Sequence, residues 1–238
     1  MQLRRVDAIF ATIVFTCAIQ SVLATSTYQY DKDEYVIIKD GMAPNKLYSL
    51  ASHGSGELGN EGFHVYLMTE SAHKTIAPLE AIGQNTILDS DPEAYHAAWS
   101  PDSRHVAVHF RSDRHILAML LYEIRNRRPH LLNAPPLLPV VAKHVDSSDD
   151  NRLLLNSLAL TWTGATSCKL QERRRYRAGT PALAQALGKY GRRRDPDVGS
   201  TGTGEYLIDF SAEAVCKLVP GRGYRIVSVK PGPFEQAN

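Results

Sequence analysis

The sequence predicts a mostly β protein, and three observations lead to this fold class. Short apolar segments rich in β-branched and aromatic residues alternate with clusters of Gly, Pro, Asp and Ser, the pattern of strands joined by turns. Long stretches with helical periodicity are almost absent. The composition, 43% hydrophobic and 22% charged with 16 Gly and 13 Pro in 238 residues, excludes a collagen-like repeat, a fully disordered chain and a polytopic membrane protein.

The first 24 residues have the composition of a secretory signal peptide. Arg4 and Arg5 supply a positive start, and residues 8–24 are uncharged and largely apolar, with Ala24 at the expected cleavage site. An uncleaved membrane anchor is the alternative, although 17 residues is near the lower limit for crossing a bilayer. We therefore expect an exported protein, periplasmic or secreted, in which residues 25–238 form a single mostly β domain.

Nine segments of the mature chain are predicted strands. They lie at residues 35–38, 46–50, 63–68, 105–110, 116–124, 153–162, 168–176, 205–210 and 224–229. One short helix is predicted at 181–187, because Thr180 can cap its start and Gly188 can end it. The Pro-rich and acidic segment 131–151 and the Gly-rich segment 188–204 are predicted loops.

Residues 97–108 contain a strand–turn–strand motif with the sequence Ala-Ala-Trp-Ser-Pro-Asp-Ser-Arg-His-Val-Ala-Val. Trp99 would end one strand, Ser100 to Ser103 would form a tight turn, and an alternating apolar strand would follow. This pattern resembles the blade signature of TolB-type and prolyl-oligopeptidase-type β-propellers. The resemblance implies antiparallel blades in which Trp99 is buried beside the turn.

Weaker copies of this motif occur once before it and once after it in the sequence. Residues 43–48 have similar turn chemistry, and Trp162 precedes a turn of small residues. The intervals are 57 residues from Met42 to Trp99 and 63 from Trp99 to Trp162, longer than the about 40–45 residues of ordinary blades. Three units are also fewer than the roughly four to eight of a closed ring. We therefore expect propeller-like antiparallel sheets that are open or incomplete, with a β-sandwich as the alternative.

The sequence offers no catalytic, metal or cofactor site that we can assign. A G-x-S-x-G nucleophile motif is absent, and His-Gly-Ser-Gly at 53–56 is interpreted as a flexible loop. His105 and His109 would lie about 13 Å apart on one strand face, too far to share a metal ion. The acidic run 146–150 does not have the spacing of an EF-hand, and the glycines of 199–204 lack the motif of a phosphate-binding loop.

Positive charge is concentrated between residues 169 and 194. Nine basic residues against one acidic residue, Glu172, give this region about +8, whereas the formal net charge of the whole chain is +2. The basic residues are Lys169, Arg173, Arg174, Arg175, Arg177, Lys189, Arg192, Arg193 and Arg194. We interpret residues 169–204 as a basic insertion that binds an anionic partner, with a merely solvated set of charges as the alternative. The candidate partners are an envelope protein, anionic lipid or acidic polysaccharide; nucleic acid is disfavoured by the export signal.

Two cysteines remain once Cys17 is removed with the signal peptide. An exported chain with two cysteines favours a disulfide between Cys168 and Cys216. If the strands around them pair antiparallel with the cysteines opposite, the residue numbers of each cross-strand pair add to 384. This register places Arg175 opposite Asp209, a favourable pair of opposite charges.

Together these features favour an exported, non-catalytic binding or scaffold protein that uses its basic region. The alternative is an exported hydrolase whose active site the sequence does not reveal. The lack of a nucleophile motif and of converging ligands favours the binding protein.

Overall fold

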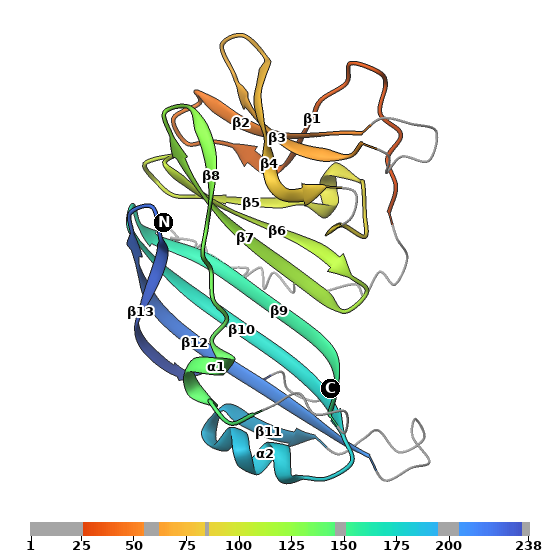
Figure 1. The fold of residues 1–238 in the computed structure, drawn as a ribbon, viewed down its shortest axis with the longest axis vertical. Helices are drawn as coiled ribbons and strands as arrows, with labels where there is room; N and C mark the ends of the chain where they lie inside the picture. Colours follow the sequence, from red (N-terminus) through yellow and green to blue (C-terminus); the bar gives the residue numbers. More distant parts are fainter. Residues whose placement is uncertain (1–25, 55–61, 84–85, 146–150, 195–204, 235–238) are drawn as a thin grey trace, which may run out of the picture.

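The strands of the computed structural model join in one large mixed sheet that does not close on itself (Figure 1). The structure describes residues 26–54, 62–83, 86–145, 151–194 and 205–234. The mostly β class predicted from the sequence is confirmed, whereas a propeller is not shown. The predicted signal peptide, residues 1–24, lies outside the described residues. Within the described part of the chain, neither short α-helix has the length or apolar composition of a bilayer-spanning segment.

The first two units of the sheet are antiparallel meanders of four strands each. The first unit contains β1 (Val36–Met42), β2 (Tyr48–His53), β3 (His64–Thr69) and β4 (Lys74–Gly83), which pair in sequence order. The second unit contains β5 (His96–Trp99), β6 (His105–Asp113), β7 (Ile116–Arg125) and β8 (Arg128–Leu132). A 3₁₀ turn, η2 (Pro92–Ala94), precedes β5, and a parallel pairing of Lys39 with His96 joins β1 to β5.

The third unit extends the sheet through a parallel pairing of β7 with β9. Its strands are β9 (Asn151–Gly164), β10 (Ser167–Ala178), β12 (Tyr206–Val219) and β13 (Gly223–Pro231). An additional short strand, β11 (Gly191–Arg194), pairs with the first part of β12, and β13 pairs with the rest. α2 (Ala182–Leu187) and the 3₁₀ turn η3 (Gly188–Tyr190) connect β10 to β11, which confirms the predicted short helix.

The first hairpins of the first and second units share one turn geometry. In the turn at 43–48 the N–H of Ala43 donates to the carbonyl of Tyr48 at 2.9 Å. In the turn at 100–105 the N–H of Ser100 donates to the carbonyl of His105 at 2.8 Å. Lys46 and Ser103 occupy the same place in these turns and have similar positive φ angles of 54° and 58°. The predicted tight turn at Ser100–Ser103 with a strand on each side is therefore confirmed.

Two tryptophans connect successive units. The indole Nε1 of Trp99 donates to the carbonyl of Gly41 in β1 at 3.0 Å. In the same way, Nε1 of Trp162 in β9 donates to the carbonyl of Ala98 in β5 at 2.7 Å. The sequence predicted that Trp99 is buried, but it is only partly buried, because its indole lies along the junction of β5 with β1.

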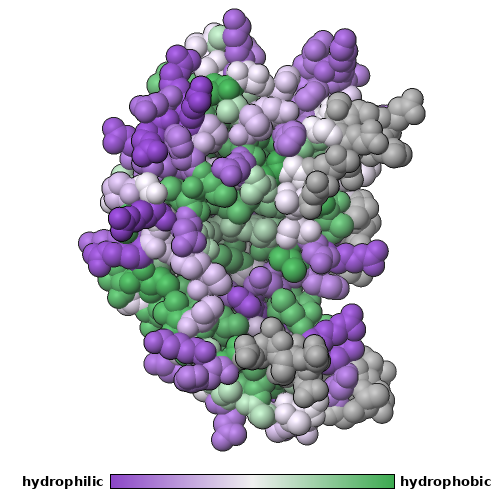
Figure 2. Space-filling view, viewed as in Figure 1, coloured by the Kyte–Doolittle hydropathy of each residue, from purple (hydrophilic) through white to green (hydrophobic). Residues whose placement is uncertain are grey.

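Two hydrophobic clusters lie on either side of the second unit. One contains Leu50 and Leu67 of the first unit with Val106 and Val108 of β6. The other contains Ala107 of β6 together with residues of the third unit and both α-helices. Successive strand residues point to opposite faces, so β6 contributes to both clusters. Figure 2 shows hydrophobic residues gathered over the middle of the molecule, with hydrophilic ones around its outline. The first and third units therefore each present one outer face.

A second α-helix, α1 (Leu138–Val141), lies in segment 131–151, for which the sequence predicted only a loop. The fully buried carboxylate of Glu172 in β10 accepts N–H bonds from Leu137 and, at 3.2 Å, from Leu138. The same carboxylate accepts a hydrogen bond from Nε of Arg174 at 2.6 Å. A distant carboxylate at the start of the helix supplies the acceptor that the local sequence lacks.

Candidate functional site

The basic region forms part of the sheet of the third unit. The arginines of 173–177 lie in β10 and those of 192–194 lie in β11, and both strands pair with β12. Only α2 and η3 connect β10 to β11. The described part of the region therefore differs from the insertion that the sequence suggested, because β10 and β11 are both hydrogen-bonded into the sheet.

Alternation along β10 places its basic side chains on two faces. Lys169, Arg173, Arg175 and Arg177 share the outer face of the third unit. The intervening positions, such as Leu170 and Tyr176, are buried in the cluster beneath α1 and α2. Charge that is continuous in the sequence is thus divided between an exposed surface and a packed core.

Three predicted site residues lie away from the outer face. Arg174 is on the inner face, where it pairs with the buried Glu172. Arg193 also alternates to the inner side, and its guanidinium lies 4.3 Å from the centre of the Tyr206 ring. Lys189 belongs to η3 and lies above the ring of Tyr190.

One row of cross-strand partners brings three arginines together on the outer face. Leu207 of β12 has Arg194 of β11 opposite it on one side and Arg177 of β10 on the other. Arg177 is in turn opposite Arg152 of β9. Sequence reasoning missed Arg152, because it precedes the basic region by 17 residues and only the β9–β10 register brings it there. We define the basic outer face as Arg152, Lys169, Arg173, Arg175, Arg177, Arg192 and Arg194.

Two carboxylates on this face neutralise part of its charge. Asp209 accepts a hydrogen bond from Nε of Arg175 at 2.7 Å and lies 3.9 Å from Nε of Arg194. Glu205 lies 3.2 Å from Nε of Arg177. Glu213 pairs instead with Lys230 of β13 at 2.9 Å. Seven basic side chains against Asp209 and Glu205 leave the basic outer face with a net charge of +5.

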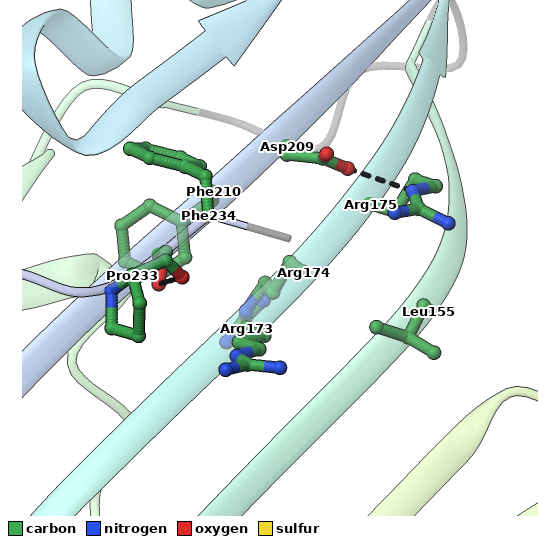
Figure 3. Close-up of a pocket in the computed structure, with 9 residues that line it drawn as sticks. Leu155, Arg173, Arg174, Arg175, Asp209, Phe210, Pro233 and Phe234 are labelled. Atoms are coloured by element: carbon green, nitrogen blue, oxygen red, sulfur yellow. Dashed lines mark hydrogen bonds and ion pairs between the residues drawn. The ribbon is translucent and has the colours of Figure 1, made fainter. Parts of the chain in front are cut away.

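A shallow pocket lies within this face, between β10, β12 and the C-terminal segment (Figure 3). Arg173 and Arg175 line it on one side, and Pro233 and Phe234 line it on the other. The hydroxyl of Ser211 donates to the carbonyl of Pro233 at 2.9 Å and so fixes that segment to β12. The free volume is about 20 Å³, room for little more than one water molecule. The site is therefore a surface for ionic contacts and not a cavity for an enclosed substrate.

Three histidines of the second unit, His96, His105 and His109, hold structural positions near the junctions between strands. Nε2 of His109 accepts the N–H of Leu160 at 3.1 Å, and burial, with the charge of His96 nearby, lowers the pKa of His109 to about 4. Burial also lowers the pKa of His105. His96 instead contacts Asp40, with 2.9 Å between Nε2 and Oδ2. These rings therefore serve as neutral or surface groups at the junctions between strands.

In the described turn after β5, Ser100, Asp102 and His105 come together as turn capping and not as a hydrolase-like arrangement. The fully buried hydroxyl of Ser100 donates to Asp102 at 2.6 Å and accepts the backbone N–H of His105 at 2.9 Å. The hydroxyl is therefore committed to the turn and does not contact an imidazole that could activate it. Among the described residues, no group of three or more His, Cys, Asp or Glu side chains is placed to hold a metal ion.

The cysteine register is confirmed, whereas the predicted disulfide is not present. Cys168 lies directly opposite Cys216, and Arg175 lies opposite Asp209, as the sum of 384 requires. Both cysteines are free and fully buried. A hydrogen bond from the Cys168 thiol to Cys216, together with burial, raises the pKa of Cys168. Strand pairing brings the two thiols together, but forming the bond also requires an oxidant to remove two electrons, which geometry does not supply.

Comparison of the chain with family models, curated protein sequences and solved structures gives no match. The function must therefore be argued from the site itself. The basic outer face carries seven basic side chains on neighbouring strands, and its ladder of arginines can bind several negative groups at once.

Proposed function

We propose that this is an exported, non-catalytic binding or scaffold protein that holds an anionic polymer on the basic outer face. The observation that carries the proposal is the row formed by Arg152, Arg177 and Arg194. Like charges on neighbouring strands destabilise a sheet, so their presence on one exposed face requires a compensating role. An anionic partner would supply that compensation.

The dimensions of the face favour an extended polyanion. Alternate residues of a strand are about 7 Å apart, so the cations from Lys169 to Arg177 follow a line of about 26 Å. Neighbouring strands add further cations about 5 Å to the side. Among the partners expected outside the cytoplasm, an acidic polysaccharide offers regularly repeated carboxylates along a chain. Anionic lipid and acidic protein are the competing partners.

We also propose that the three units are propeller-like blades in an open array. The shared hairpin turn at 43–48 and 100–105 supports this interpretation. The hydrogen bonds of Trp99 and Trp162 to the preceding units support it as well. In an open array the last blade keeps one face free, and that free face is the basic outer face.

The proposal is tested by binding to immobilised polygalacturonate, with neutral dextran as the matrix control. The test variant replaces Arg152, Arg177 and Arg194 with Gln. The matched control replaces Arg125, Arg127 and Arg128, exposed residues around the β7–β8 turn, with Gln. Both variants lose the same charge, so a difference between them reports position and not net charge.

We expect the protein to bind polygalacturonate, with retention falling as salt rises. The first variant should bind at least about tenfold more weakly, because three charge-assisted contacts are lost. The control variant should bind like the original protein. Equal weakening in both variants would contradict the proposal. Binding to phosphatidylglycerol vesicles without binding to polygalacturonate would replace the polysaccharide with a lipid surface.

A further inference from the structure

The outer face of the first unit, at the opposite end of the molecule, has a different chemistry (Figure 1). One row of cross-strand partners consists of Ile37, Ala51, Tyr66 and Pro78, and none of these residues is charged. Ile37 is 44% exposed although its side chain is apolar. Ala51 is fully buried, so Ile37, Tyr66 and Pro78 form the accessible part of this row. The row is uncharged, whereas the row described for the third unit contains three arginines.

Aromatic rings form a continuous platform on this surface. Tyr35 is 37% exposed and stacks on His53, with ring centres 4.5 Å apart and planes at 23°. The edge of Tyr66 meets Tyr35 at 5.5 Å, and His64 meets Tyr66 at 5.9 Å. His53 and His64 are direct cross-strand partners, so the platform bridges β2 and β3. We call these four residues the aromatic platform.

Both histidines of the aromatic platform have a fixed hydrogen-bonding role. Nδ1 of His53 lies 2.6 Å from the carbonyl of Glu34, and Nδ1 of His64 lies 3.2 Å from the carbonyl of Ile82. A carbonyl only accepts, so each ring donates through Nδ1. In the neutral ring Nε2 is then an acceptor. The platform therefore combines ring surfaces, phenol hydroxyls and two imidazole acceptors.

A groove adjoins the aromatic platform where β4 leaves the ladder. Between the pairs Tyr66–Pro78 and His64–Gly83, β3 advances by two residues and β4 by five. The extra residues bulge outward and border an open groove of about 400 Å³, which His64 and Glu80 also line. Ala81, within the bulge, has a φ of 67°, a conformation that costs energy for a residue with a Cβ. Bulges and such strain are concentrated at binding sites.

We infer that the aromatic platform and its groove bind a neutral oligosaccharide. A sugar ring has an apolar face of C–H groups and a rim of hydroxyls. The C–H face suits the exposed ring of Tyr35, and the hydroxyls suit the acceptors of His53, His64 and Glu80. The stacked pair of Tyr35 and His53, with planes at 23°, offers one flat ring surface for the C–H face of a sugar. Tyr66 stands at 79° to Tyr35, so an organic cation held between perpendicular rings is the competing ligand in the test.

This site uses none of the residues of the basic outer face. The inference therefore stands apart from the proposed function, and either can fail alone. The variant lacking Arg152, Arg177 and Arg194 should bind the sugar normally, because the two surfaces belong to the first and third units.

The test measures binding of maltotetraose, cellotetraose and chitotetraose to the protein by saturation-transfer NMR and calorimetry. The test variant is Tyr35→Ala, which removes an exposed ring, and the control is Tyr190→Ala, which removes a partly buried ring of the third unit. Thermal unfolding of each variant checks that the fold is retained. Tetramethylammonium serves as the competing cationic probe.

We expect at least one oligosaccharide to bind, and Tyr35→Ala to weaken that binding about tenfold through loss of the ring contact. Tyr190→Ala should leave the affinity unchanged. The inference is overturned if none of the three sugars binds at about 10 mM, well above a Kd of about 1 mM. Unchanged affinity in Tyr35→Ala overturns it too, as does binding of tetramethylammonium in place of sugar.

Discussion

The two faces of the third unit are built from alternating residues of the same strands, yet their charges have different surroundings. On the inner face Glu172 is fully buried and is satisfied by Arg174 and by α1. On the outer face Arg177 and Arg194 are only partly paired, and Arg152 is exposed. The comparison teaches that the face of the strand on which a charged side chain lies decides whether it serves folding or binding. Its place within a run of basic residues in the sequence does not.

The largest expected effect concerns the buried pair. Glu172→Leu should destabilise the protein by about 3–5 kcal/mol, because it leaves Arg174 uncompensated and removes the acceptor at the start of α1. The measurement is urea unfolding followed by circular dichroism.

Two further variants sharpen this test. Glu213→Leu, a partly exposed partner of Lys230 on the outer face, should cost less than about 1 kcal/mol. The double variant Glu172→Leu/Arg174→Leu should be less destabilised than the sum of its single variants. A single Glu172→Leu variant as stable as Glu213→Leu would remove the distinction between the two faces.

The next effect concerns acid stability at the junction of the second and third units. The pKa of folded His109 is lowered to about 4, below the ordinary value of 6.5, because the ring is buried and lies near His96. The unfolded chain therefore binds the proton more readily than the folded chain. The contribution of His109 to the free energy of unfolding is fully present above pH 6.5, where the ring is neutral in both states. As the pH falls towards 4, the free energy of unfolding decreases by up to about 3 kcal/mol.

Unfolding measured from pH 7 to pH 4 checks this effect. His109→Gln should reduce the slope of stability against pH in this window, because Gln accepts a hydrogen bond without titrating. His115→Gln, an exposed position, should leave the slope unchanged. If both variants retain the original slope, His109 is not the responsible group.

The smallest effect concerns the hydrogen bonds that link successive units. Trp99→Phe and Trp162→Phe should each cost about 1–2 kcal/mol, because the carbonyls of Gly41 and Ala98 lose their donors. Tyr35→Phe, which removes a hydroxyl from an outer face, should cost less than about 0.5 kcal/mol. Thermal unfolding distinguishes them, and a similar shift in all three would show that the indole contacts contribute no special stability.

The sequence predicted the features that local rules govern. Ser-Pro-Asp-Ser predicted the turn after Trp99, because those residues favour its backbone angles and cap its amides. Gly188 ends α2 as predicted, whereas the predicted cap by Thr180 is wrong, because Pro181 occupies the N-cap position and no side chain caps the helix. The β10–β12 register followed from two facing cysteines, because one pair fixes all others in an antiparallel ladder.

Apart from the β10–β12 pairs, tertiary structure alone decided which residues of distant strands share a face. Arg152 joins Arg177 only through the pairing of β9 with β10, and Glu172 meets Leu137 only through the packing of α1. The aromatic platform likewise depends on the β2–β3 pairing and on the bulge of β4. A local sequence pattern encodes the backbone conformation of its own segment, whereas a site is made by side chains whose proximity is set by strand pairing across the whole sheet.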